Sequence, residues 1–71
     1  MEKYILPRTL VTSSGEIMEQ PVVVLSMTFA AIEDGVIVQD NLHTHLVLTP
    51  EDAATVAASI NETIEEINNN G

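Results

Sequence analysis

The feature that most constrains the fold is a pair of apolar, β-branched runs separated by Asp34-Gly35. Residues 22–32 read VVVLSMTFAAI, and residues 36–48 read VIVQDNLHTHLVL. Three consecutive valines disfavour a helix, because β-branched side chains lose rotamer freedom there. An Asp-Gly pair between two such runs is typical of a two-residue hairpin turn. The sequence therefore predicts an antiparallel hairpin made of strands 22–32 and 36–48.

The hydrophobic pattern also predicts a register for this hairpin. A two-residue turn at Asp34-Gly35 would place Phe29 opposite Asp40 and Val23 opposite Leu46. One face of the hairpin would then be almost entirely apolar in both strands, whereas a slip of one residue would turn one strand's apolar set to the wrong side. This face would carry Val23, Leu25, Met27, Phe29, Ala31, Val36, Val38, Leu42, Leu46 and Leu48. We expect a bulge at Asp40-Asn41, in the middle of the second strand.

A further strand is predicted over residues 4–12, which are rich in apolar and β-branched side chains. Pro7 has no N–H to donate, so this strand should be an edge strand or a bulged one. Residues 13–16, Ser-Ser-Gly-Glu, are typical of a turn. The chain would then return along residues 17–20, and Pro21 would interrupt the pairing.

A helix is predicted over residues 50–67. Thr49 suits the N-cap and Pro50 the first helical position, and Glu51 and Asp52 complement the positive end of the helix dipole. Asn68 and the residues after it are poor helix formers, so the helix should fray there. The apolar residues recur at spacings of three and four, as in an amphipathic helix: Ala53, Val56, Ala57, Ile60, Ile64 and Ile67.

Together these elements predict a single small α+β domain over residues 1–71. Its architecture would be an antiparallel β-meander of about three strands, with one C-terminal α-helix packed across one sheet face. The other sheet face would stay open, and large apolar patches on soluble proteins usually mark interfaces. We therefore expect a partner there, most simply a second copy in a homodimer, although the sheet edge is an alternative seam. The interface on the open face would use Val22, Val24, Ile32, Ile37 and Val47.

The charge balance excludes several classes of partner. With 11 acidic residues against 2 basic ones, the 71-residue chain has a formal net charge of −9. Both cations, Lys3 and Arg8, precede residue 9, and Glu2 is the only acid that does. Nucleic acids and anionic lipids are bound mainly by cationic side chains, so we expect neither as a partner. A basic protein is favoured, and Glu62, Glu65 and Glu66 on the helix are its candidate docking site; the alternative is a solvated face that keeps the protein soluble.

Size and cysteine content limit how the domain can be stabilised. A chain this short buries only about 60% of its unfolded surface and often needs a staple. The absence of cysteine excludes disulfides and thiolate zinc sites, which leaves oligomerisation or a histidine metal site. The N-terminus does not read as a signal peptide, and the longest near-apolar run, residues 21–32, is too short for a membrane helix. We expect a cytoplasmic protein.

His43 and His45 are the one feature with a hint of metal chemistry. Two apart on a strand, they project from the same face about 7 Å apart, and such a pair can ligate a transition metal. A zinc site needs three or four ligands, and only these two are evident. The alternative is a pair hydrogen-bonded to neighbours such as Ser26 or Asn41, or one that titrates in an interface. We expect no bound cofactor.

No nucleophile elbow, phosphate loop or dinucleotide fingerprint is present, and 71 residues rarely enclose a catalytic pocket. The sequence therefore predicts a non-enzymatic acidic protein-interaction module. Its sharpest form is an inhibitor or regulator of the phage or mobile-element type, which binds a host protein by presenting a nucleic-acid-like negative surface. The alternatives are a metal- or pH-responsive module that uses His43 and His45, and a structural accessory subunit of a larger assembly.

Overall fold

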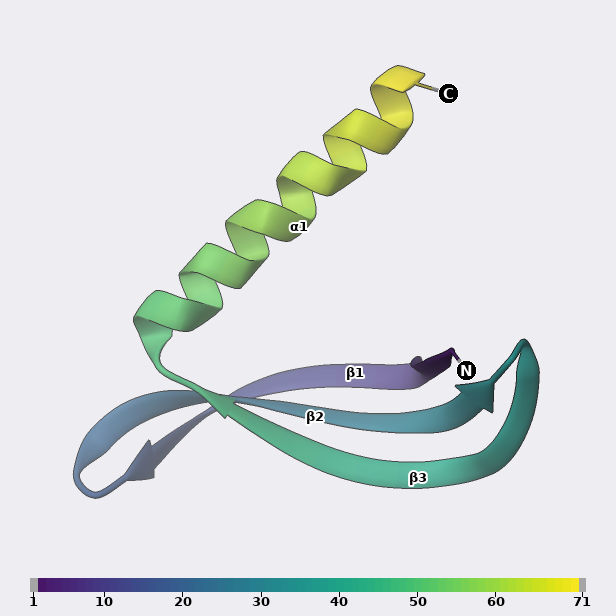
Figure 1. Cartoon of the computed structure of the whole chain (residues 1–71). Helices are drawn as coiled ribbons and strands as arrows, with labels where there is room; N and C mark the ends of the chain where they lie inside the picture. Colours follow the sequence, from purple (N-terminus) through teal and green to yellow (C-terminus); the bar gives the residue numbers. More distant parts are fainter. Residues whose placement is uncertain (1, 71) are drawn as a thin grey trace.

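The computed structural model describes residues 2–70 and shows a three-stranded antiparallel sheet followed by one helix (Figure 1). The elements are β1 (Lys3–Ile17), β2 (Gln20–Glu33), β3 (Val36–Leu48) and α1 (Pro50–Asn70). The strands lie in the order β1-β2-β3, so each pairs with its neighbour in sequence. The α+β meander with a C-terminal helix against the sheet is therefore confirmed.

The β2–β3 hairpin turns at Asp34-Gly35, where both residues have positive φ (51° and 82°). Glu33 pairs with Val36 as predicted, but the register changes in two places before Phe29 pairs with Leu42. The predicted pairing of Phe29 with Asp40 is therefore wrong by two residues. The expected bulge at Asp40-Asn41 is present, and a second irregularity lies at Val38. This stretch of β3 therefore contains two residues more than the facing stretch of β2. Because the shift is two residues, residues 42–48 keep the sheet faces that the sequence predicted.

The β1–β2 hairpin differs more from expectation. β1 continues through residues 13–16, so the predicted turn there is wrong, and its strand is longer than residues 4–12. The chain turns instead at Met18 and Glu19, both with positive φ (51° and 67°), and Ile17 pairs with Gln20 across them. Neither residue type favours that conformation, so the sequence carries no signal for this turn.

Two prolines lie where the sheet does not use their nitrogen for pairing. Pro7 lies in the edge strand β1, and the register shifts directly after it, so the expectation of an edge or bulged strand is confirmed. Pro21 lies within β2 opposite Glu16 and does not break the pairing with β1. Because β3 ends opposite Val23, no strand lies on the second side of β2 at Pro21, and a missing N–H there breaks no ladder bond.

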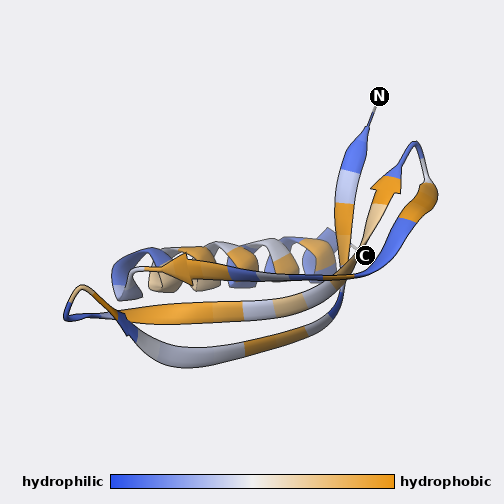
Figure 2. Cartoon of the chain, turned by 90° about the horizontal axis from the view of Figure 1, so that it is seen from below, coloured by the Kyte–Doolittle hydropathy of each residue, from blue (hydrophilic) through white to orange (hydrophobic). Residues whose placement is uncertain are grey.

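The sheet is sharply bent (Figure 2), and both outer strands contain register shifts, β1 after Pro7 and β3 at residues 38–41. Arg8, the extra residue of β1, donates from Nη2 to Oδ2 of Asp40 on β3 at 3.2 Å. The ion pair joins the two outer strands and so crosses β2 close to Ala30. Ala30 is completely buried, the only described residue in that class. The small side chain of Ala30 thus leaves room for the Arg8–Asp40 ion pair across the central strand.

The helix begins as the sequence predicts. The Asp52 N–H donates to Thr49 Oγ1 at 3.1 Å, and the Ala53 N–H donates to the Thr49 carbonyl at 2.9 Å, so Thr49 is the N-cap. The helix continues to Asn70 rather than fraying near Asn68. Asparagine costs only a fraction of a kcal/mol per helical residue, which is too little to end a helix that already propagates. Within residues 2–70, α1 lacks the sustained apolar length that a membrane-spanning helix needs.

Candidate functional site

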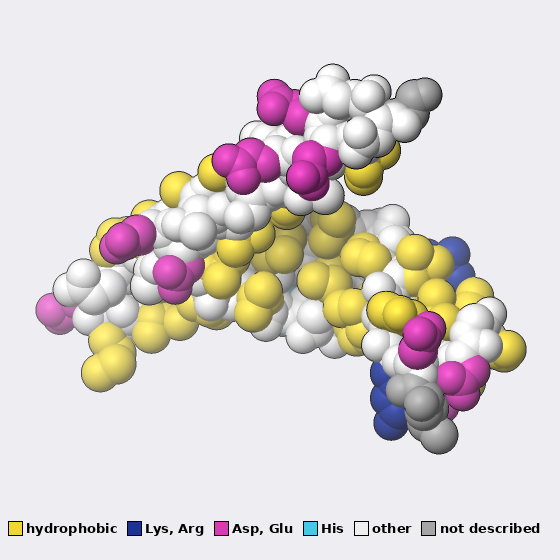
Figure 3. Space-filling model, turned by 45° about the horizontal axis from the view of Figure 1, so that its top comes forward, with side chains coloured by type: hydrophobic (Ala, Val, Ile, Leu, Met, Phe, Trp, Pro, Cys, Tyr) yellow, Lys and Arg dark blue, Asp and Glu magenta, His cyan; other side chains and the backbone are white. Residues whose placement is uncertain are grey.

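An apolar groove lies between the helix and the sheet. Figure 3 shows hydrophobic side chains gathered in this space, while carboxylates line the helix above it. The groove measures about 310 Å³ and is almost wholly apolar. Its lining, called the apolar groove below, consists of Leu10, Thr12, Val23, Leu25, Leu48, Ala53, Val56, Ala57 and Ile60. The helix therefore faces the sheet side that the hydrophobic pattern selected, through its small residues Ala53 and Ala57.

The helix covers this face incompletely. Ala53 is its only half-buried residue in the described part of the chain, and none is fully buried. Figure 1 shows the helix rising away from the sheet towards its C-terminus. The apolar stripe stays exposed as a result: Ile60 keeps 54% of its accessible surface, Ile64 48% and Ile67 65%. The sequence predicted an open surface only on the other side of the sheet, so this exposed stripe was not expected.

The opposite face carries the predicted interface residues in varied environments. Val22, Val24 and Ile32 are half-buried on the central strand, whereas Ile37 and Val47 on the outer strand are exposed. Polar side chains interrupt this face in its middle. The hydroxyls of Thr9 and Thr28 lie 2.7 Å apart in a hydrogen bond between β1 and β2. This face is therefore more mixed than the groove side, and its role as an interface stays a prediction.

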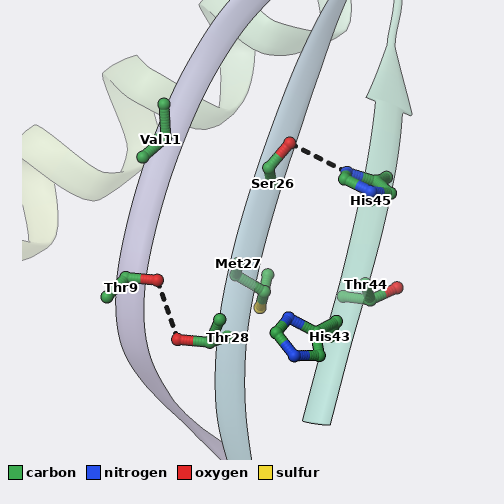
Figure 4. Close-up of a pocket in the computed structure, with 8 residues that line it drawn as sticks. All are labelled: Thr9, Val11, Ser26, Met27, Thr28, His43, Thr44 and His45. Carbon is green, nitrogen blue, oxygen red and sulfur yellow. Dashed lines mark hydrogen bonds between the residues drawn. The ribbon is translucent and has the colours of Figure 1, made fainter. Parts of the chain in front are cut away.

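His43 and His45 lie on this opposite face, on β3 beside β2 (Figure 4). They border an open hollow of about 140 Å³ that Thr9, Ser26 and Thr28 also line. His45 Nδ1 is hydrogen-bonded to Ser26 Oγ at 2.8 Å, as one of the alternatives anticipated. Both histidines are exposed to solvent.

The surroundings of this pair limit its chemistry. Residues 2–70 contain no group of three or more His, Cys, Asp or Glu side chains that could hold a metal ion, so a third ligand would have to come from elsewhere. Ser26 and His45 have the composition of a hydrolytic dyad, but they lie in the middle of paired strands. Backbone N–H groups engaged in a ladder are not free to stabilise an oxyanion. Metal binding stays a prediction.

Within residues 2–70, both ion pairs lie in the sheet. Lys3 Nζ lies 3.5 Å from Glu33 Oε1, and Arg8 pairs with Asp40. The N–H of Asn41 donates to Asp40 Oδ1 at 2.8 Å; this backbone hydrogen bond, followed by the Arg8 side chain, lowers the pKa of Asp40 below its ordinary value.

Both cations of the chain are therefore engaged with sheet carboxylates. The candidate docking residues Glu62, Glu65 and Glu66 are exposed on α1, and the described part of the chain gives them no ion pair.

Comparison with known proteins adds no relative. No family model, no curated protein and no solved structure matches this chain.

Proposed function

We propose that this chain is a non-enzymatic module that binds a basic protein through the acidic outer side of α1. The observation that carries the proposal is the uncompensated charge of the helix. Glu62, Glu65 and Glu66 are exposed, while Lys3 and Arg8 are both paired within the sheet. The helix also has no basic residue in its last turn. A cationic partner would relieve this concentration of negative charge.

The geometry of the two hollows supports a binding role over a catalytic one. The apolar groove is lined by aliphatic side chains and Thr12, without an acid, a base or a nucleophile of raised reactivity. The hollow beside the histidines is open and measures only about 140 Å³, whereas ligand-binding pockets usually measure about 300–1,000 Å³.

The narrower form of the proposal is an inhibitor of the phage or mobile-element type in the cytoplasm. Such a protein would present carboxylates where a nucleic-acid-binding protein expects phosphates. A net charge of −9 in 71 residues supports this form, because attraction to a phosphate-binding surface grows with the density of negative charge.

The experiment is affinity capture with the immobilised protein at low and high salt, read by mass spectrometry. The test variant is Glu62→Gln, Glu65→Gln, Glu66→Gln. The control variant, Glu2→Gln, Glu16→Gln, Glu19→Gln, changes the net charge equally but leaves the helix intact. We expect basic proteins to be retained by the parent and the control at low salt, and lost with the test variant and at high salt.

Equal capture by both variants would overturn the assignment of the helix as the docking site. Capture that salt does not weaken, or no specific capture at all, would overturn the electrostatic proposal itself.

A further inference from the structure

The chain exposes far more surface than a folded protein of its mass. Its accessible surface is 5777 Å², whereas a folded monomer of 7.7 kDa is expected to expose about 4,300 Å². The excess is about 1,500 Å² per chain, well above the roughly 800 Å² that each partner buries in a standard interface. Two copies that covered this excess would bury about 3,000 Å² together, which is the range of obligate homodimers.

Part of the exposed apolar surface lies on the helix-bearing side. The apolar groove is open, and Ile64 and Ile67, with 48% and 65% of their accessible surface exposed, continue the apolar stripe of the helix beyond it. On the sheet, the same face extends past the bend, where Ile5 lies opposite Ala31 and Phe29 lies opposite Leu42. Each copy therefore offers a helix stripe that needs an apolar sheet face, and an apolar sheet face that needs a cover.

We propose that two copies pack through their helix-bearing sides, so that Ile64 and Ile67 of each copy cover the sheet of the other beyond its bend. Such an interface is self-complementary and closes under two-fold symmetry. The carboxylates support it, since Glu62, Glu65 and Glu66 occupy helix positions away from the stripe and stay in solvent. An apolar helix stripe and an apolar sheet face on one chain make a second copy the occupant that matches both.

The opposite face of the sheet is less suited to be the interface between two copies. Its middle is occupied by the Thr9–Thr28 and Ser26–His45 hydrogen bonds, and buried polar groups must keep partners to avoid a desolvation penalty. The helix side has no comparable polar row in its groove, where Thr12 is the one polar side chain.

The primary test is analytical ultracentrifugation of the parent and of two charge insertions. Ile64→Asp places a carboxylate on the stripe, whereas Ala58→Asp places the same group on the far side of the helix. We expect the parent and Ala58→Asp to sediment as dimers. Ile64→Asp should dimerise on the order of 30-fold more weakly or worse, as when an interface anchor is lost. A parent that is monomeric up to near-millimolar concentration would overturn the proposal, as would equal dimerisation by both variants.

A second measurement does not depend on variants that fold. Isotope-filtered NMR on a mixture of labelled and unlabelled parent detects contacts between copies. We expect contacts from the Ile64 and Ile67 methyl groups to Phe29 and Leu42 of the other copy. Contacts between copies that involve Val11 and Val47 instead would assign the seam to the opposite face and overturn the proposal.

The response to salt distinguishes the proposed dimer from capture of a basic partner. The dimer does not depend on the proposed function. Two chains of charge −9 repel one another, so added salt should leave an apolar dimer intact or strengthen it. Capture of a basic partner should weaken under the same conditions. A salt-resistant dimer without partner capture would support this inference and overturn the proposed function, and the reverse pattern would do the opposite.

Discussion

The turn between β1 and β2 can be improved by design, and the gain can be worked out from its backbone. Met18 and Glu19 both adopt positive φ, at 51° and 67°, and Met18 is 92% exposed. A non-glycine residue in the left-handed region costs roughly 1–2 kcal/mol. Asn-Gly is the pair that two-residue hairpins with two positive φ angles prefer. The double substitution Met18→Asn, Glu19→Gly should therefore stabilise the fold.

The net gain is smaller than the strain that it removes. Glycine relieves the strain at position 19 but gives back roughly 0.5–1 kcal/mol through the extra freedom of the unfolded chain. Asparagine tolerates the left-handed region better than methionine does and contributes a few tenths of a kcal/mol more. We expect a net stabilisation of about 1 kcal/mol, which raises the melting temperature by roughly 4–8 °C in a domain of this size.

The assay is thermal unfolding followed by circular dichroism, at equal chain concentrations because self-association would shift the melting temperature. Ser14→Asn is the informative control, since it creates the same Asn-Gly pair with Gly15 inside β1. If the turn lies at Met18-Glu19, this control should destabilise the protein. An unchanged or lowered melting temperature for the double variant, together with stabilisation by Ser14→Asn, would refute the turn and the register of the whole first hairpin.

Three other substitutions test the bend and the helix start. Ala30→Val should cost about 1–3 kcal/mol in denaturant unfolding, because the completely buried site has no room for two more methyl groups; Ala31→Val is the matched control, and equal stability of both variants would contradict the packing at the bend. Thr49→Ala should cost about 0.5–2 kcal/mol through loss of the N-cap bond, and a helix equally stable without this hydroxyl would argue against the cap. The lowered pKa of Asp40 means that its contribution to stability is present above the unfolded aspartate pKa and is lost as the pH falls through the lower folded value. Asp40→Asn should therefore flatten the acid limb of the stability profile below about pH 4, and an acid limb identical to the parent's would contradict this role.

Local patterns predicted the elements that local rules control. β3 has the predicted bounds, and Thr49 and Pro50 begin the helix as expected. The turn at Asp34-Gly35 was predictable because both residues tolerate positive φ. The turn at Met18-Glu19 was not, since the pairing of the flanking strands imposes it against the preference of both residues.

Which apolar surface stays exposed depends on how much of the sheet the helix covers, and local sequence patterns do not give this. Figure 1 shows that α1 rises away from the sheet towards its C-terminus, so the far part of the stripe, up to Ile67, stays exposed. Neither the direction of the helix nor the bend of the sheet follows from the periodicity of the apolar residues. The histidine pair was placed correctly on one face, because alternation along a strand is a local property.

The interruptions of β1 and β3 also bear on unwanted polymerisation. An unbroken outer strand is a template to which further strands can add without limit, as in amyloid fibres. Here β1 carries Pro7 and a register shift in its first half, and β3 carries irregularities at Val38 and at Asp40-Asn41. An incoming strand could not keep continuous hydrogen bonding along the whole of either edge. The same local insertions that bend the sheet thus discourage fibre growth in a chain that leaves most of its apolar side chains accessible.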